Sequence, residues 1–196
     1  MSIEDITIVI TSFKSSDKIN SCLDSISSKA KVIVVENSGS QKFKESVEKK
    51  YQNLQCIIPN DNLGYAKGNN LGLSKVDTKY ALVLNPDTVL QDKALENFLT
   101  TASQHPDFSL IGPFSDQGKE IKNKKELTQV KNLKGFAIFF NMKKFQKNKF
   151  FDENYFLYFE EIDLCRSVIK DKGKIYLDPT ILILHEGAKS VNKIYS

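Results

Sequence analysis

Short apolar runs alternate with amphipathic segments along the first half of the chain. The runs are continuous and as long as strands, and they lie at 6–10, 31–35, 54–58 and 80–84. Between them apolar residues recur at helical spacing, as Ile19, Cys22, Leu23 and Ile26 do. We predict helices there, over 42–51, over 65–73 and after a cap at Asp92. Such alternation is typical of a parallel sheet that helices cover on both faces.

The second half continues with fewer regular elements. Strands are expected at 109–112 and 135–141, and a helix carries Ile162, Cys165, Val168 and Ile169 on one face before a stop at Gly173. Two further strands are expected at 174–178 and 181–185. The predicted fold class is α/β, with a mostly parallel central sheet flanked by helices. At 196 residues the chain is expected to form a single domain, 1–196.

Polar loops follow four of the predicted strands, where ligands bind in open α/β sheets. These loops begin after Ile10, Val35, Ile58 and Leu84, and they are rich in small polar and acidic residues. In the last of them Pro86 restricts Asn85 to an extended shape and places Asp87 at the carboxyl edge of the sheet. A carboxylate there suits Mg²⁺ or Mn²⁺, although Asn-Pro-Asp-Thr is also a good turn sequence.

Two further groups of residues are candidates for chemistry. His185 closes the last predicted strand, where it is either a metal ligand or a hydrogen-bonded structural residue. Glu160, Glu161 and Asp163 open a helix directly after the aromatic run 155–159. They either stabilise the helix end, or one of them is desolvated by the aromatic side chains and acts as a general base.

Charge is distributed unevenly along the sequence. The net charge is +4, yet residues 117–150 alone hold ten lysines and two glutamates, so the rest of the chain is mildly acidic. This distribution argues against a nucleic-acid-binding protein. We interpret 117–150 either as a solvated lysine-rich loop or as a surface that docks a phosphate-bearing acceptor or an anionic membrane.

Composition narrows the class and the location of the protein further. No apolar run approaches the roughly 18 residues of a membrane span, and the N-terminus lacks the basic region of a secretory signal. Cys22, Cys56 and Cys165 form no CxxC pair and fit small core positions, which favours a reducing compartment. The chain has no GxGxxG, GxxxxGK[ST] or GxSxG motif, so dinucleotide oxidoreductases, P-loop NTPases and α/β-hydrolases are not supported.

Six segments, in order, resemble motifs of the family 2 glycosyltransferases of the GT-A fold, nearest to bacterial rhamnosyltransferase-like members that build surface polysaccharides. The first strand with TSFK resembles the opening strand of that family, and VVENSGS resembles its VVDNxS motif. NLGYAKGNNLGL resembles its glycine- and asparagine-rich stretch, and LNPDT stands in the place of the metal-binding DxD. FFDENYFLYFEEIDLCRS resembles the FDExFFxYxEExDLCxR signature, and HEGAKS resembles the terminal His-x-x-x-x-Ser.

The resemblance implies an inverting transfer of a sugar from a nucleoside-diphosphate sugar to an acceptor hydroxyl, with Mg²⁺ or Mn²⁺ as cofactor. The acceptor is expected to be a saccharide or a lipid-linked molecule, and the pathway that of surface polysaccharide or glycolipid. Residues 1–112 would form the nucleotide-sugar-binding half, and 113–196 the acceptor-side and catalytic half. The enzyme is expected in the cytoplasm, either free or peripheral at the inner face of the cell membrane through 117–150, and without nucleic-acid partners.

Carried over residue by residue, the resemblance also assigns a site. Glu161 would deprotonate the acceptor, with Glu160 and Asp163 as alternatives, and Asp87 and His185 would hold the metal. The nucleotide-sugar-binding residues would be Thr11, Ser12, Phe13, Glu36, Asn37, Gly64, Lys67, Asn70, Asn85 and Asp87. Glu36 stands where the family usually has an aspartate, residues 85–87 carry one carboxylate where many relatives have two, and only eleven residues follow His185. We therefore expect a nearly minimal catalytic core with a trimmed acceptor side.

Two other functions remain open from the sequence. The single carboxylate and the short C-terminal part motivate a non-catalytic nucleotide-sugar-binding or scaffold protein on the same fold. A nucleotidyltransferase on a similar sheet is a third alternative, and it would release diphosphate in place of transferring a sugar.

Overall fold

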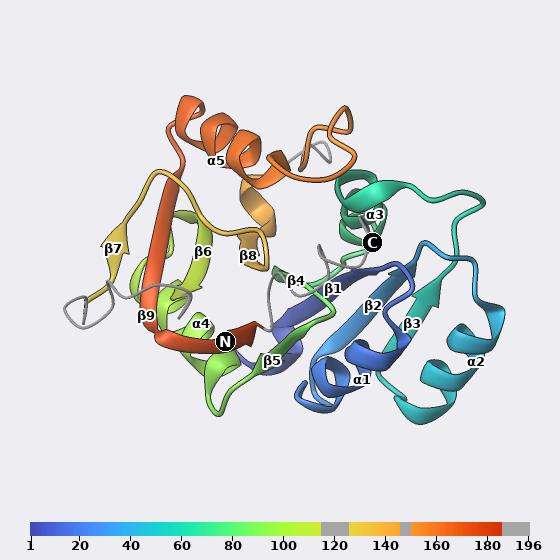
Figure 1. The fold of residues 1–196 in the computed structure, drawn as a ribbon. Helices are drawn as coiled ribbons and strands as arrows, with labels where there is room; N and C mark the ends of the chain where they lie inside the picture. The colour runs from blue at the N-terminus through green and yellow to red at the C-terminus, as the bar shows by residue number, and fades with distance from the viewer. Residues whose placement is uncertain (115–125, 146–149, 186–196) are drawn as a thin grey trace.

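The computed structural model describes residues 1–114, 126–145 and 150–185 as a sheet with helices on both faces (Figure 1). Part of the lysine-rich stretch 117–150 and the residues after His185 lie outside the described ranges. The α-helices are α1 (Ser16–Asp24), α2 (Gln41–Lys50), α3 (Gly64–Leu73), α4 (Ala94–Gln104) and α5 (Glu160–Lys170). The strands are β1 (Ile6–Ser12), β2 (Lys31–Glu36), β3 (Leu54–Ile57), β4 (Tyr80–Leu84), β5 (Thr88–Leu90), β6 (Phe108–Phe114), β7 (Thr128–Gln129), β8 (Ala137–Asn141) and β9 (Lys174–His185). Short 3-10 turns at Ile3–Asp5 and Met142–Lys144 complete the described elements.

The sheet joins the two halves of the chain in the strand order β3-β2-β1-β4-β8-β6-β9-β5, with β7 beside β9. Strands β1 to β4 pair in parallel, as the continuous apolar runs predict. The second half departs from the expected mostly parallel sheet, because β8 runs antiparallel to both β4 and β6. The sheet is therefore mixed, with a parallel part that aligns the ends of β1, β2 and β4 at one edge.

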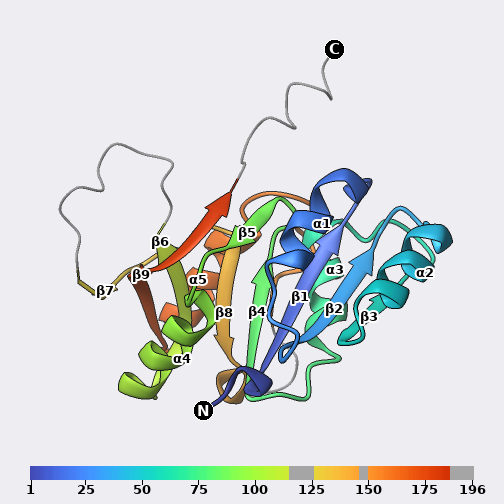
Figure 2. The same cartoon turned by 90° about the horizontal axis from the view of Figure 1, so that it is seen from below.

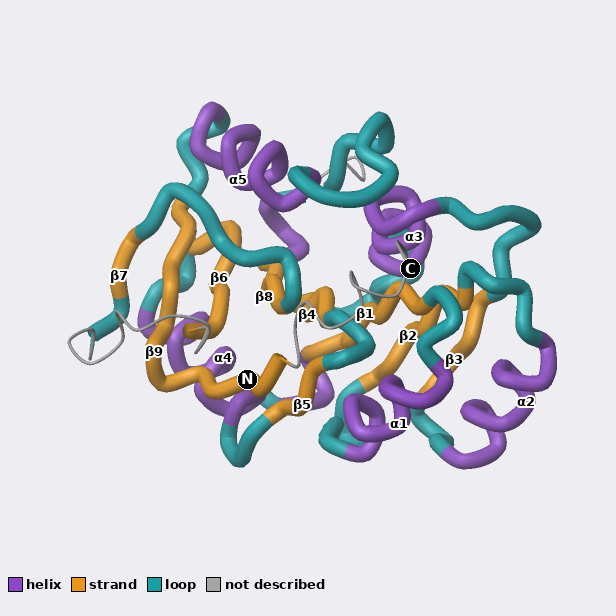
Figure 3. Tube along the Cα trace, viewed as in Figure 1, coloured by secondary structure: helices purple, strands orange, loops and turns teal. Residues whose placement is uncertain are grey.

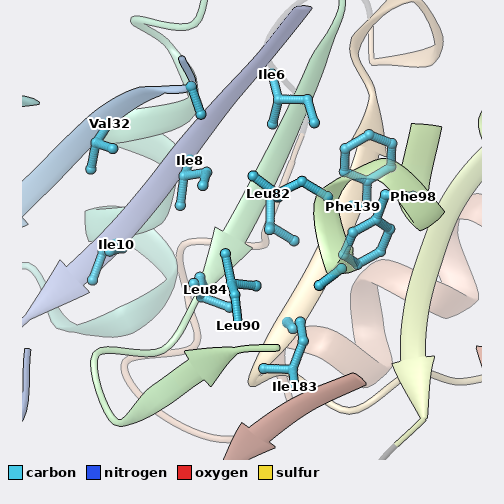
Figure 4. Close-up of a cluster of buried hydrophobic side chains, with 14 of the residues drawn as sticks. Ile6, Ile8, Ile10, Val32, Leu82, Leu84, Leu90, Phe98, Phe139 and Ile183 are labelled. Atoms are coloured by element: carbon cyan, nitrogen blue, oxygen red, sulfur yellow. The ribbon is translucent and has the colours of Figure 1, made fainter. Parts of the chain in front are cut away.

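Two hydrophobic clusters fill the space between the sheet and the helices, one on each face of the sheet. Helices α1, α2 and α4 cover one face, and α3 and α5 cover the other (Figures 1 and 2). Successive strand residues alternate between the clusters: Ile8 and Ile10 pack toward α1, whereas Val9 packs toward α3. Figure 4 shows the first cluster, where Phe98 of α4 stacks on Phe139 of β8 with ring centroids 4.7 Å apart. This double burial explains why the strands are apolar at consecutive positions.

Strand β9 replaces the two final strands that the sequence predicts. Its first part pairs with β6, and its register shifts between Pro113 and Phe114, so that Leu182 follows Asp178 as a partner on β9. Its last part pairs antiparallel with β5, which puts His185 opposite Thr88. Because β5 follows β4 closely in the chain, this pairing places the end of β9 next to the turn between β4 and β5.

Some local predictions differ from the structure. Helix α4 begins at Ala94 after Lys93, whose φ of 64° is left-handed, so Asp92 does not form the expected cap. The short strands β5 and β7 were not indicated by the sequence pattern, because each has three residues or fewer. Cys22, Cys56 and Cys165 are all buried free thiols, as expected. Among the described residues, no helix combines the length and the apolar character that crossing a membrane requires.

Candidate active site

The carboxyl edge of the parallel strands brings the first two polar loops together. Ser12 at the end of β1 pairs in register with Glu36 at the end of β2, and both are buried. The backbone N–H of Asn37 donates to the Ser12 carbonyl over 2.8 Å, which keeps the two strand ends parallel one residue further. The family resemblance assigns Ser12, Glu36 and Asn37 to the nucleotide sugar, and the structure brings them side by side.

Thr11 and Ser12 differ in how their hydroxyls are satisfied. The Thr11 hydroxyl donates to Oδ1 of Asn69 on α3 over 2.9 Å. The buried Ser12 hydroxyl and the Asn69 Nδ2 atom have no hydrogen-bond partner among the described residues. Buried polar groups are nearly always paired, so these two unpaired groups, one at the end of β1 and one on α3, make this junction a candidate position for the polar atoms of a ligand. Phe13, the next residue, is exposed.

Glu36 closes a tight turn. Its Oε1 atom accepts a hydrogen bond from the Ser38 backbone N–H at 2.9 Å and contacts the Ser38 hydroxyl. The neighbouring Asn37 side chain donates to the Gly64 carbonyl over 3.0 Å. The loop after β2 is thus held to the start of α3.

Glycines allow α3 to approach both the sheet and the loop that leads into α5. Gly64 has a φ of 72°, and a Cβ atom at this position would lie 2.5 Å from the Phe156 carbonyl oxygen. A Cβ at Gly68 would lie 2.6 Å from Cγ2 of Thr11. Figure 3 shows the loop that leads into α5 beside the start of α3. Position 64 therefore favours glycine for two reasons: its φ is positive, and a side chain would clash with the Phe156 carbonyl oxygen where the start of α3 meets the loop before α5.

Lys67 and Asn70, which the resemblance assigns to the nucleotide sugar, lie further along α3. Lys67 is exposed. Asn70 donates through Nδ2 to the Phe151 carbonyl at 2.9 Å and accepts through Oδ1 from the Phe151 N–H at 3.0 Å. The structure therefore engages Asn70 with the loop before α5.

The turn after β4 positions Asp87 next to His185. The Asn85 N–H donates to the Phe136 carbonyl over 2.8 Å, and the Thr88 hydroxyl donates to the Asn85 carbonyl over 2.7 Å. Nε2 of His185 lies 3.3 Å from Oδ1 of Asp87. The His185 ring also stacks on Phe136, with centroids 4.8 Å apart.

The electrostatics of Asp87 follow from this neighbour. Burial raises the pKa of the Asp87 carboxyl, but the hydrogen bond and electrostatic attraction of His185, with smaller contributions from the backbone and Lys18, outweigh burial, so its pKa lies below the ordinary value. Asp87 is accordingly ionised near neutral pH, as a metal ligand has to be.

The side chains at this point suit a cation site in which the protein supplies two ligands and the substrate phosphates and water supply the rest. Within 1–114, 126–145 and 150–185, no three side chains of His, Cys, Asp or Glu gather to hold a metal ion. Asp87 and His185 supply one carboxylate and one imidazole at a single point. A carboxylate suits Mg²⁺ and Mn²⁺, imidazole is a common metal ligand, and Mg²⁺ typically takes one or two carboxylates with substrate phosphates and water.

The acidic start of α5 forms the other side of the site. Glu160 is buried, at 5% exposure, and its Oε2 atom has no hydrogen-bond partner among the described residues. Burial raises the pKa of the Glu160 carboxyl, and the negative charge of Glu161 adds to the shift. Glu161 and Asp163 are half-buried, and the Glu161 side chain lies beside Gly135.

The aromatic run before α5 does not form the expected cluster over these carboxylates. Phe156, Tyr158 and Phe159 are exposed at 58%, 59% and 65%. Tyr158 and Phe159 both have left-handed φ, at 70° and 71°, which turns the chain sharply into the helix. Left-handed backbone costs a non-glycine residue about 1–2 kcal/mol, and such strain is concentrated at functional sites.

Tyr65, the second residue of α3, is a member of the site that the sequence analysis missed. Its hydroxyl lies 2.7 Å from the Gly135 carbonyl and 3.0 Å from Oδ1 of Asn85. It sits between the turn that carries Asp87 and the residue that Glu161 contacts. The only signal in the sequence was an aromatic residue inside NLGYAKGNN, and helical periodicity alone would assign it to the core.

Comparison with solved structures defines the fold. The mannosyltransferase PcManGT from Pyrobaculum calidifontis, in complex with GDP-Man and Mn²⁺, superposes with a TM-score of 0.80 at 12% identity, over 94% of this chain and 57% of that one. TarS 1–349 from S. aureus, in complex with UDP-GlcNAc, superposes with a TM-score of 0.71 at 16% identity, over 93% of this chain and 56% of that one. The fold is the GT-A glycosyltransferase fold, which confirms the expectation from the family resemblance.

Sequence comparison then gives the family. The model of the family described as Glycosyl transferase family 2 matches residues 7–165, and the chain belongs to that family. It is 25% identical over 190 residues to the low-salt glycan biosynthesis hexosyltransferase Agl10 of Haloferax volcanii, covering 83% of this chain and 61% of the relative. The chain thus spans about three fifths of the length of that curated relative.

Proposed function

We propose that the protein is an inverting glycosyltransferase that moves a hexosyl group from a nucleoside-diphosphate sugar to an acceptor hydroxyl. The observation that carries the proposal is the meeting of two chemical groups around one side chain. Tyr65 contacts Asn85, in the turn that carries Asp87, the partner of His185. It also contacts Gly135, which lies beside Glu161, the neighbour of Glu160. A candidate cation-binding pair near two carboxylates suits transfer from a diphosphate, since a cation can neutralise the leaving group and a carboxylate can accept the acceptor's proton.

The donor's nucleotide is assigned to the ends of β1 and β2. The unpaired Ser12 hydroxyl and Asn69 amide offer hydrogen bonds, and the exposed ring of Phe13 offers a face on which a base can stack. Two of the similar structures, PcManGT and TarS, contain GDP-Man and UDP-GlcNAc, which supports a nucleotide sugar as donor. Rhamnose is one candidate among the sugars to be tested.

Asp87 and His185 would hold the divalent cation. When bound, Mg²⁺ or Mn²⁺ neutralises the negative charge that grows on the diphosphate leaving group. The Mn²⁺ in the PcManGT complex supports a metal of this kind. This chain's own contribution is to keep Asp87 ionised beside His185 and fixed by the Asn85 turn.

Glu161 is proposed as the general base. It is half-buried at the start of α5, so an acceptor hydroxyl can reach it, whereas Glu160 is enclosed. The acceptor oxygen bonds to the anomeric carbon on the face opposite the diphosphate, its proton passes to the carboxylate, and the bond from the anomeric carbon to the diphosphate oxygen breaks. The configuration at the anomeric carbon is inverted as a result. Glu160 and Asp163 remain the alternative bases.

The experiment is a panel of UDP-, dTDP- and GDP-sugars with Mn²⁺ or Mg²⁺, followed by nucleotide release and sugar transfer. Turnover by the wild type that Glu161→Gln lowers by about 10²–10⁴-fold supports the proposal. Binding of a nucleotide sugar with no turnover in either protein would favour the non-catalytic binding protein. Release of diphosphate from a nucleoside triphosphate would favour a nucleotidyltransferase. No binding of any nucleotide sugar would contradict the proposal.

A role in cell-surface glycan synthesis, and contact with an anionic membrane, are part of the same proposal. The relative Agl10 is named for glycan biosynthesis. In the described part of 117–150, Lys131 and Lys134 are exposed before β8, and Lys134 adjoins Gly135 at the site. Lys143 and Lys144 are exposed after β8, at the opposite end of that strand. We assign contact with a phosphate-bearing acceptor or membrane to the first pair.

A further inference from the structure

Tyr65 touches three separate segments of the active site. Its hydroxyl, which has one proton, is shared between the Gly135 carbonyl at 2.7 Å and Oδ1 of Asn85 at 3.0 Å. Its backbone N–H donates to the Phe156 carbonyl over 2.7 Å. These contacts reach the segment before β8, the turn after β4 and the loop before α5.

The ring of Tyr65 is itself held in place. It meets Phe151 edge-on, with centroids 6.2 Å apart and planes inclined by 69°. Phe151 in turn is fixed through its backbone by Asn70. The ring therefore has a packing partner that does not depend on the hydroxyl.

The surroundings keep the hydroxyl protonated. Burial is the largest influence that raises the pKa of the Tyr65 phenol, and the negative charges of Glu160, Glu161 and Asp87 add to it. A phenol in this environment stays a hydrogen-bond donor throughout the neutral range. Both of its neighbours, a carbonyl oxygen and an amide oxygen, are acceptors.

We propose that Tyr65 is a positioning residue for the transfer, and that its hydroxyl fixes the Asn85–Asp87 turn relative to Gly135 and the adjoining Glu161. Through this link the donor's diphosphate end and the general base keep the separation that in-line attack needs. The inference rests on the proposed function, because it assigns Tyr65 a role within that reaction. Tyr65 acts through Asn85 and Gly135 and is not proposed to exchange a proton with substrate.

The test compares Tyr65→Phe with Tyr80→Phe. Tyr80 begins β4, the strand that Asn85 follows, and its buried ring stacks on Phe108 and Phe139 while its hydroxyl contacts Met1. Each variant loses one hydroxyl and keeps a packed ring. We expect Tyr65→Phe to lower kcat of transfer about tenfold, the equivalent of one good hydrogen bond, with KM for the donor nearly unchanged. Tyr80→Phe should leave kcat unchanged.

A second measurement does not depend on the reaction. The Asn85 N–H, bonded to the Phe136 carbonyl, reports by hydrogen exchange whether the two segments separate. In the ligand-free protein we expect this amide to exchange several times faster in Tyr65→Phe than in Tyr80→Phe. Equal exchange in the two variants would overturn the link.

The results separate the two proposals. An active wild type with equal kcat in both variants would overturn the role of Tyr65 and leave the proposed function intact. An inactive wild type with faster Asn85 exchange only in Tyr65→Phe would contradict the transferase and support the link. A Tyr65→Phe loss that appears equally in donor KM and in thermal stability would show a structural role only, which contradicts the positioning role.

A double-mutant cycle tests whether Asn85 is the residue through which Tyr65 acts. If Tyr65 acts through Asn85, combining Tyr65→Phe with Asn85→Ala should lower kcat no further than Asn85→Ala alone. Independent, multiplying losses would contradict that connection.

Discussion

His185, the last residue of β9, lies with Nε2 3.3 Å from Oδ1 of Asp87, which follows β4. The pairing of β5 with β9 creates this contact, because it puts His185 opposite Thr88, the neighbour of Asp87. Residues distant in the sequence thus form one candidate cation site. That site leads to the first prediction.

Replacing Asp87 by Asn should remove the effect of Mn²⁺ on nucleotide binding. The variant loses the carboxylate that a hard cation needs, and we expect metal-assisted affinity for UDP or GDP to fall by more than about tenfold. Calorimetric titration of the nucleotide with and without Mn²⁺ measures this. Asp92→Asn, an exposed carboxylate on the next turn, is the control. The same Mn²⁺ dependence in Asp87→Asn and wild type would count against the site.

Replacing Gly64 by Ala should destabilise the protein more than replacing Gly39 by Ala. Both glycines have left-handed φ, 72° and 75°, so each alanine costs about 1–2 kcal/mol in conformation. Only at Gly64 would the new Cβ lie 2.5 Å from the Phe156 carbonyl, whereas nothing lies within 4 Å at Gly39. We expect a further loss of about 1–3 kcal/mol at Gly64 from this overpacking, measured by urea unfolding. Equal losses would mean that the loop moves aside freely.

Replacing Glu160 by Gln should stabilise the folded protein at neutral pH. The pKa of Glu160 is raised by burial in the folded state, so the folded state binds this proton more tightly than the unfolded state. Stability from this group is therefore present at low pH and is lost as pH rises through the raised pKa. Gln cannot ionise, so the variant keeps this part of the free energy of unfolding at neutral pH. The difference in stability from the wild type should shrink as pH falls below the ordinary pKa of glutamate.

Urea unfolding between pH 4 and pH 8 checks this dependence, with Glu161→Gln at the half-buried neighbouring position for comparison. An advantage of Glu160→Gln that does not change with pH would show that the burial of a charge is not its cause.

Reversing the charges of Lys131 and Lys134 to Glu should weaken binding to anionic membranes. Each lysine near an anionic surface contributes about 1 kcal/mol, so the double variant should lose at least about tenfold in binding. Co-sedimentation with phosphatidylglycerol vesicles at low and high salt measures it. Lys143→Glu with Lys144→Glu, at the far end of β8, is the matched control. Sedimentation that is independent of anionic lipid and salt would remove the membrane contact.

The parallel part of the sheet was predictable because its strands are buried on both faces. Ile6 to Ile10 and Tyr80 to Leu84 are apolar at nearly every position, and this pattern has few other structural solutions. The antiparallel direction of β8 was harder to predict, since GFAIFFN has the same apolar character in either direction. The sequence predicted two strands in place of β9, because Pro179 is typical of a break between strands.

The site was predictable where strand ends carry it, and less so where packing decides. The family resemblance assigns Ser12 and Glu36, and both stand at the ends of predicted parallel strands, which the structure pairs in register. The different burial of Glu160 and Glu161 does not, because both stand in the first turn of one helix and only tertiary contacts separate them. Tyr65 was missed for the same reason: its proposed positioning role depends on two acceptors, Asn85 and Gly135, that other segments bring to it.

The antiparallel pairing of β5 with β9 also sets an order of assembly during synthesis. The residues proposed to bind the nucleotide lie at the ends of β1 and β2 and leave the ribosome first, whereas His185 comes from the last described strand. A nascent chain can therefore form its nucleotide side well before it can close β5 against β9 and present Asp87 with its imidazole partner. Cation affinity would then rise only when the sheet has closed, which makes it a natural reporter of completed folding.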